Sequence, residues 1–229
     1  MLNYLNYMGW FFHHKKYKME NKYTDYLRLK RDYNYDILRS ICVNPTSKLI
    51  YFKPGKSAGT SIFRRNLQPK GGWIIQKDNP KEFNNWLQNI TDKELNSYFK
   101  FIFVRNPFSR LISAWNDIDK PYFPDFGKFV QEGIFDKNGN PKTLHYQLQS
   151  SLFKTLDNYS LNLDFIGKIE NIKDDWKTLC NLTNLPYQEL GHYANRNHNH
   201  YTTYYTDEIR EIVSNWYRRD LEFFNYNFK

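Results

Sequence analysis

Residues 50–62 read IYFKPGKSAGTSI. The apolar start is typical of the end of a buried strand, and the small residues after it are typical of a turn into a helix. A strand, a small-residue turn and a helix can bind phosphate, because backbone N–H groups and the positive end of the helix dipole meet the anion there. Lys56 would add a point charge, and further donors are the hydroxyl groups of Ser57, Thr60 and Ser61.

This turn differs from the phosphate loop of the common ATPases. Their pattern, G-x-x-x-x-G-K-[ST], matches Gly55-Lys56-Ser57, but its first glycine would fall at Ile50, inside the apolar run. The long loop that wraps a phosphate is therefore missing. An ordinary strand-to-helix turn with a solvated lysine remains the alternative interpretation.

A second segment has the same construction. The apolar run at 101–104 is followed at once by RNPFSRLISAW, in which Asn106 suits a helix cap and Pro107 the first helical turn. Arg105 would then end a strand, and Ser113 would lie two turns into the helix, so the two could grip a second phosphate. The alternatives are an ion pair for Arg105 and a solvated helix position for Arg110.

Together, PGKSAGTS at 54–61 and RNPFSRLIS at 105–113 resemble the two signature elements of the sulfotransferases, most of all the carbohydrate branch with the loop P-K-T-A-G-T-S. Members of that family use 3′-phosphoadenosine-5′-phosphosulfate (PAPS) as the donor. The resemblance implies that the first element holds the 5′-phosphosulfate and the second the 3′-phosphate. Gly55 departs from the family, which usually has proline there. The expected donor-binding residues are Lys56, Ser57, Ala58, Gly59, Thr60, Ser61, Arg105, Ser113 and Arg196.

Two later segments extend the resemblance to roughly residues 48–228. DFIGKIENI at 164–172 resembles the family's F-I-G-R-x-E-N-L strand and helix, and 192–228 resembles its closing loop and last helix, with Arg196 in the loop. The expected fold is α/β, a central parallel sheet flanked by helices in the P-loop-like sulfotransferase arrangement. The pattern predicts strands at 48–53, 72–75, 100–104 and 165–169, and helices at 58–67, 80–89, 92–99, 107–117, 171–182 and 206–217.

We expect two parts, an N-terminal helical extension at 1–46 and the sulfotransferase domain at 47–229. The extension is read as a basic helix packed on the domain, with a membrane-surface or partner-binding helix as the alternative. Residues 118–163 would, by the resemblance, shape the acceptor pocket.

The net charge and the cysteine content limit which binding partners and which cell compartment we expect. The formal net charge is +9 over 229 residues, which favours anionic partners. We expect a nucleotide donor and a hydroxyl acceptor, a glycan by the resemblance, and not nucleic acid. Two cysteines make no disulfide framework, and no run reaches the roughly 18–20 apolar residues that span a bilayer. The expectation is a cytoplasmic, bacterial enzyme without a transmembrane segment, with peripheral membrane contact left open.

Sulfuryl transfer needs a cation for the leaving oxygen and a base for the acceptor hydroxyl. Lys56 is the expected cation. His145 is the first choice of base, because HYQLQ at 145–149 resembles the family's H-x-x-P-Q motif, with Leu148 in place of proline. Asp78 and then Glu82 are the alternatives. Their non-catalytic interpretations are a helix cap for Asp78, a solvated position for Glu82 and a hydrogen-bonded loop residue for His145.

No metal is expected. His192, His198 and His200 invite a zinc site, but zinc sites usually add Cys or carboxylate ligands at defined spacing, and an Asn- and His-rich loop closing over the nucleotide is preferred. Other functions remain open at this point. They are a tyrosyl-protein or small-metabolite sulfotransferase, a P-loop kinase, and a non-enzymatic basic module that binds glycan or nucleic acid.

Overall fold

The computed structural model describes residues 36–137, 139, 141–153, 162–191 and 199–229. Its centre is a five-stranded sheet with the order β3-β1-β2-β4-β5. The strands are β1 (Ile41–Asn44), β2 (Leu49–Phe52), β3 (Ile74–Ile75), β4 (Phe99–Val104) and β5 (Phe165–Lys168). Strands β2, β4 and β5 are parallel, whereas β1 pairs antiparallel with both β2 and β3. The predicted α/β sheet is confirmed, with a parallel core and an antiparallel side.

Strand β1 was not predicted. It forms a hairpin with β2, and the turn is closed by the backbone N–H of Ser47, which donates to Oδ1 of Asn44 at 3.0 Å. The described end of the expected 1–46 extension thus includes a strand of the sheet. The sheet begins before the expected boundary, and residues 1–35 lie outside the described part.

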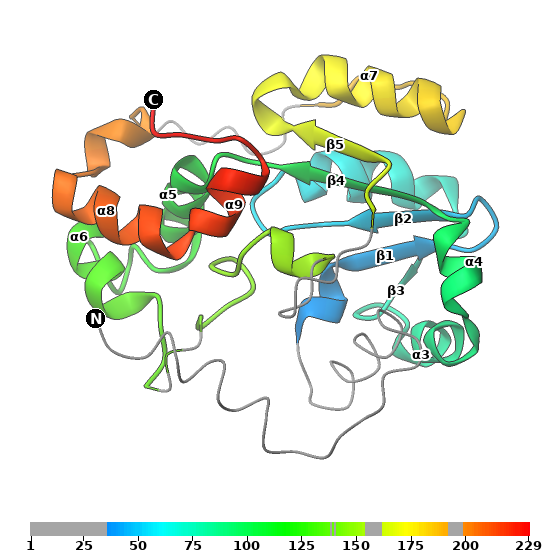
Figure 1. The fold of residues 1–229 in the computed structure, drawn as a ribbon, viewed down its shortest axis with the longest axis horizontal. Coiled ribbons are helices and arrows are strands. Elements are labelled where there is room, and N and C mark those ends of the chain that lie inside the picture. The colour runs from blue at the N-terminus through cyan, green and yellow to red at the C-terminus, as the bar shows by residue number, and fades with distance from the viewer. Residues whose placement is uncertain (1–35, 138, 140, 154–161, 192–198) are drawn as a thin grey trace.

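Both faces of the sheet are buried, because alternate strand residues point to opposite sides. Ile50, Phe52, Ile102 and Val104 pack in one core with α3 (Pro80–Asn89), whereas Tyr51, Phe101 and Phe103 pack in another with η3 (Thr60–Leu67) and α7 (Ile172–Thr183). A third apolar cluster lies beyond the strand ends, where α5 (Pro107–Ile118) meets α8 (Asp207–Trp216) and Tyr217. In Figure 1 this cluster occupies the side on which these two helices gather with α6 (Phe126–Lys128) and α9 (Arg218–Phe223).

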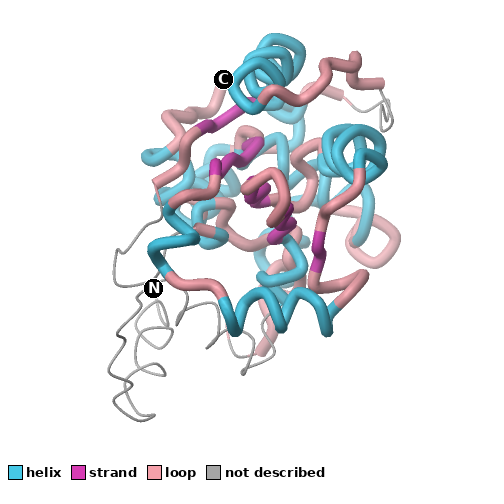
Figure 2. The backbone as a smooth tube through the Cα atoms, turned by 90° about the vertical axis from the view of Figure 1, so that its right-hand side faces the viewer, coloured by secondary structure: helices cyan, strands magenta, loops and turns pink. Residues whose placement is uncertain are grey.

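The helices surround the sheet on both faces, as the side view in Figure 2 shows. They are η2 (Asp36–Ser40), η3 (Thr60–Leu67), η4 (Gln68–Lys70), α3 (Pro80–Asn89), α4 (Asp92–Asn96), α5 (Pro107–Ile118), α6 (Phe126–Lys128), η5 (Phe129–Gly133), η6 (Ser150–Leu152), η7 (Ile169–Asn171), α7 (Ile172–Thr183), η8 (Tyr201–Tyr204), α8 (Asp207–Trp216) and α9 (Arg218–Phe223). None of these described helices is long and apolar enough to cross a membrane.

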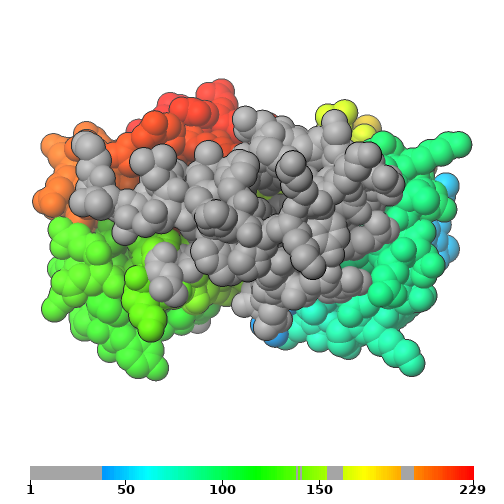
Figure 3. All heavy atoms as spheres, turned by 60° about the horizontal axis from the view of Figure 1, so that its bottom comes forward, coloured from blue at the N-terminus to red at the C-terminus, as the bar shows by residue number. Residues whose placement is uncertain are grey.

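Helix starts follow the polar caps in the sequence. Thr91 caps α4 in a reciprocal capping box with Glu94. Asn106 caps α5 through Phe108 N–H at 3.0 Å, as predicted. The cap of α3 is Asn79 rather than Asp78, since Oδ1 of Asn79 accepts from Glu82 N–H at 3.2 Å. Helices α3 and α5 lie on opposite sides of the molecule, and Figure 3 shows the chain around residues 75–100 and around 110–150 at opposite ends of one face.

Candidate functional site

The loop between β2 and η3 is shaped to bind an anion. Lys56 and Ala58 have positive φ angles, 65° and 53°, which non-glycine residues seldom adopt. Gly59 then returns to φ −56°. When neighbouring residues have φ angles of opposite sign, their N–H groups turn toward one point and form an anion-binding nest. No side chain caps the start of η3, so its first N–H groups have no side-chain acceptor. The strained loop and the uncapped helix point to a phosphate-like ligand.

A second lysine, Lys53, lies at this loop, and no role was predicted for it. The side chain of Lys53 lies across Gly59, where an added Cβ would be 3.1 Å from Lys53 Cδ and 3.9 Å from its Nζ. Within the described residues no carboxylate forms an ion pair with Lys53. Its ammonium therefore adds positive charge beside the nest.

Lys56 lies against the side of α5 that faces the loop between β2 and η3. Its Nζ is 3.0 Å from Oδ2 of Asp117, and its backbone carbonyl accepts from Nη1 of Arg105 at 3.4 Å. Ser109, Ser113 and Asp117 follow one another at four-residue spacing and lie along one side of α5, and Arg105, just before the helix, contacts the first of them. The structure thus brings the expected residues Lys56 and Arg105 together at the ends of β2 and β4, whereas Ser113 lies inside α5, one turn before Asp117.

Arg105 is a partly buried cation. Its Nε donates to Oγ of Ser109 at 3.0 Å, and burial, opposed by the charge of Glu170, lowers the pKa of Arg105 below its ordinary value. No carboxylate in the described residues forms an ion pair with it. Glu170 instead accepts from the backbone N–H of Asn106 at 2.8 Å and from the hydroxyl of Tyr226 at 2.7 Å. An anionic ligand would offset the desolvation of this guanidinium.

His145 lies directly beside the first loop. A Cβ at Gly55 would collide with Nδ1 of His145, which explains why this chain has glycine where a proline is expected. Burial, followed by the charges of Lys56 and Arg110, lowers the pKa of His145 below its ordinary value, which favours the neutral ring. Nδ1 is buried and has no hydrogen-bond partner among the described residues. A neutral imidazole near Lys56 is suited to accept a proton.

Arg110 is not the solvated helix residue that the sequence allowed. It is 1% exposed, and its guanidinium donates to the backbone carbonyls of His145 at 3.1 Å and of Gln147. The same group lies 3.5 Å from the carbonyl of Gly55 and 5.4 Å from the ring centre of Tyr217. Arg110 therefore joins α5 to the first loop and to the segment that carries His145.

Gln149 is the site residue that the sequence analysis missed, although it ends the HYQLQ motif. It is 1% exposed, and its Oε1 accepts from Oγ of Ser57 at 3.1 Å and from the backbone N–H of Arg105 at 3.0 Å. Its Nε2 donates to the Arg105 carbonyl at 2.9 Å. The hydroxyl of Ser57, expected to meet the donor, is thus fully buried and bonded to Gln149.

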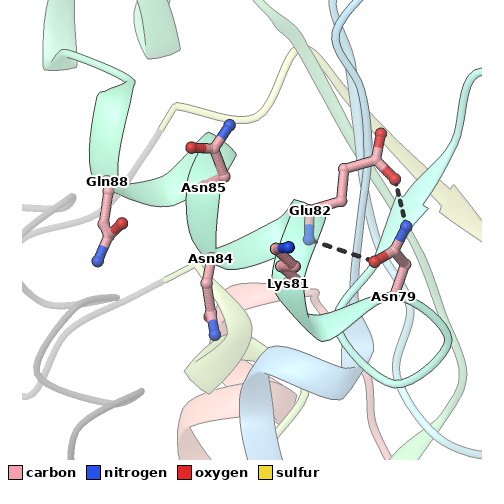
Figure 4. A pocket seen from close by; sticks show the side chains of 6 residues that line it. All are labelled: Asn79, Lys81, Glu82, Asn84, Asn85 and Gln88. Carbon is pink, nitrogen blue, oxygen red and sulfur yellow. Dashed lines mark hydrogen bonds between the residues drawn. The ribbon is translucent and has the colours of Figure 1, made fainter.

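The alternative bases lie elsewhere. Asp78 contacts Arg64 at 3.9 Å and Gln68 at 3.4 Å, beyond the first turn of η3. Among the described residues, no hydrogen bond or ion pair joins Asp78 to the loop between β2 and η3. Glu82 accepts from Nδ2 of Asn79 at 2.6 Å in the cap of α3. A polar hollow over this helix, drawn in Figure 4, is lined by Asn79, Lys81, Glu82, Asn84, Asn85 and Gln88.

The expected closing loop is only partly described. Arg196, His192 and His198 lie outside the described residues. Oγ of Ser61 donates to the carbonyl of Gly191 at 3.2 Å, so the chain enters that loop beside the first turn of η3, where Thr60 is exposed. Among the described residues, no group of three His, Cys, Asp or Glu is placed to hold a metal ion.

Comparison with known proteins identifies related sequences. The model of the sulfotransferase family matches residues 39–227. Human carbohydrate sulfotransferase 9 is 25% identical over 234 aligned residues, which cover 81% of this chain and 53% of the relative. The chain thus spans about half the length of that curated relative. No solved structure matches the chain.

Proposed function

The chain belongs to the sulfotransferase family, and we propose that it transfers the sulfuryl group of PAPS to a hydroxyl group of a carbohydrate. One observation carries the proposal. The nest after β2 and the arginine after β4 end neighbouring parallel strands and are joined by the bond from Arg105 Nη1 to the Lys56 carbonyl. Ligands of open α/β sheets bind at such strand ends. Two anion sites side by side suit a nucleotide with phosphate at both its 3′ and 5′ positions.

The residues at the two elements divide the donor between them. The N–H groups around Ala58 and Gly59, with Lys53 and Lys56, would hold the 5′ end. Arg105 and Ser113 would hold the 3′-phosphate, because an arginine fork matches phosphate oxygens and a hydroxyl adds a donor. The bound donor supplies an activated sulfuryl group with a phosphate leaving group.

Lys56 and His145 would carry the chemistry. As the acceptor oxygen bonds to sulfur and the bond from sulfur to the phosphate oxygen breaks, negative charge builds on that oxygen, and the Lys56 ammonium stabilises it. The ion pair with Asp117 keeps this ammonium at the loop until an anion competes for it. His145, neutral and next to Gly55, would take the acceptor's proton. The bonds that anchor Glu82 and Asp78 to other groups support His145 over both.

The acceptor class is supported by the name of the human relative, a carbohydrate sulfotransferase. The test uses purified protein, PAPS labelled with radioactive sulfur, and parallel panels of glycans, tyrosine peptides and small phenols. Label should pass to a glycan. Transfer to peptides or phenols alone would move the proposal to the other sulfotransferase classes, and failure to bind adenosine 3′,5′-diphosphate would end it.

The cytoplasmic location stays a prediction, which fractionation of the native cells would check.

A further inference from the structure

We propose that Gln149 is a positioning residue that sets the spacing between the two donor-binding elements. The inference rests on the proposed function, since it assigns a role to a residue that would touch neither the donor nor the acceptor. It starts from an amide side chain that is buried between two loops and bonded to both.

The contacts of Gln149 make a bridge. Its oxygen accepts from Oγ of Ser57, in the first loop, and from the backbone N–H of Arg105, at the end of β4. Its nitrogen donates to the carbonyl of Arg105. The two bonds, to the backbone N–H and to the carbonyl of Arg105, resemble the bonds between paired β-strands. They fix the backbone of Arg105 and therefore the point from which its side chain extends. One planar amide therefore couples the position of the nest to that of the 3′-phosphate ligand.

The bridge itself is held rigidly. Both oxygens of Asp220, which is fully buried, accept backbone N–H bonds from the start of η6, at 2.7 Å from Gln149 and at 2.9 Å from Ser150. Upstream, the hydroxyl of Tyr217 donates to the carbonyl of Tyr146 at 2.8 Å, and Arg110 grips the carbonyls on either side. Residues 145–150 are therefore bonded to α5 and to the α8–α9 region along their length. These bonds to the backbone of the segment favour one arrangement of the bridge, although Nε of Arg110 and Oγ of Ser150 have no partner among the described residues.

This arrangement matters most to a ligand with two phosphate groups. Such a ligand must meet both elements at once, so any freedom in their spacing has to be removed on binding and weakens the complex. A ligand with a 5′-phosphate alone meets only the first element and is indifferent to that spacing. Loss of the bridge should therefore reduce the preference for the doubly phosphorylated nucleotide more than it reduces binding in general.

The test compares adenosine 3′,5′-diphosphate with adenosine 5′-monophosphate by calorimetry on Gln149→Met, which keeps the length of the side chain and removes all three bonds. The preference for the diphosphate should fall about tenfold, because the spacing of the two elements must then be fixed on binding, while affinity for the monophosphate changes less than about threefold. Leu87→Ala, in the buried side of α3 remote from both loops, is the matched control for lost stability, and it should leave the preference unchanged.

The outcomes separate the two proposals. If wild type binds the diphosphate preferentially and folded Gln149→Met does so to the same degree, the bridge has no positioning role, and the proposed function stands. If wild type shows no preference, the proposed function fails and this inference fails with it. Should Gln149→Met not fold, Ser57→Ala removes the bond to the first loop alone and should lower the preference about threefold; an unchanged preference there would also overturn the inference.

Discussion

The loop after β2 and the loop after β4 end neighbouring strands, yet they present charge in different ways. The first is built from backbone, with positive φ angles at Lys56 and Ala58 and an uncapped helix start. The second is built from side chains, with Asn106 capping α5 and Arg105 partly buried. A backbone nest with lysines can follow charge that moves during a reaction, whereas a desolvated, hydrogen-bonded arginine suits a group that stays unchanged. The difference assigns chemistry to the first loop and recognition to the second.

The largest expected effect tests the first half of this assignment. Lys56→Ala should lower turnover about a thousandfold, because a charge contact made mainly in the transition state is lost. Affinity for adenosine 3′,5′-diphosphate, measured by calorimetry, should fall much less. Lys53→Ala is the matched control at the same loop and should reduce turnover less. If Lys56→Ala keeps its turnover while product affinity collapses, the two loops share one role.

His145 sharpens the same contrast, because its ring lies against Gly55 of the first loop. His145→Gln should lower turnover about a hundredfold and leave product binding intact. Burial and the charge of Lys56 lower the pKa of His145, so the active neutral form is lost only as the pH falls below the ordinary histidine value of about 6.5.

The pH profile checks this assignment independently of the rate. Wild-type activity should rise with pH through an acidic limb whose midpoint lies below the ordinary histidine value, and His145→Gln should lack the limb. A limb that survives in the variant would assign the base to a different group, and Asp78→Asn is the next variant to measure.

Arg105 tests the second loop. A hydrogen bond between charged partners contributes about 1.5–3 kcal/mol, so Arg105→Ala should reduce the preference for adenosine 3′,5′-diphosphate over the 5′-monophosphate by tenfold or more. Turnover at saturating donor should change less than it does in Lys56→Ala. Calorimetry with both nucleotides provides the measurement, and an unchanged preference would place the 3′-phosphate site elsewhere.

The sequence predicted each loop by itself but not what joins them. Local signals sufficed for β4, for the Asn106 cap and for the loop at Lys56, because apolar runs, caps and small residues act over a few positions. Strand β1 was missed, since its four residues, Ile41–Asn44, lie next to an N-terminal stretch with a helical pattern. Gln149 and Asp220 lie 71 positions apart, and neither has a local pattern that reveals a partner at such a distance. The same holds for Arg110, whose burial depends on carbonyls of a remote segment.

The smallest expected effect compares two helix caps, only one of which belongs to the site. Asn106→Ala and Thr91→Ala each remove a side-chain bond to a helix start, and each should lower the free energy of unfolding by about 1 kcal/mol, a shift of roughly 2–4 °C in Tm for a chain of this size. Thr91 lies beside α4, away from both loops, so nucleotide binding should be unchanged. Asn106 follows Arg105 and also donates to the carbonyl of Asn227 at 2.9 Å, so its loss should loosen the arginine and weaken diphosphate binding about threefold. Equal nucleotide affinity in the two variants would show that the recognition loop does not depend on its cap, and that the bonds of Gln149 to the Arg105 backbone are enough to hold it.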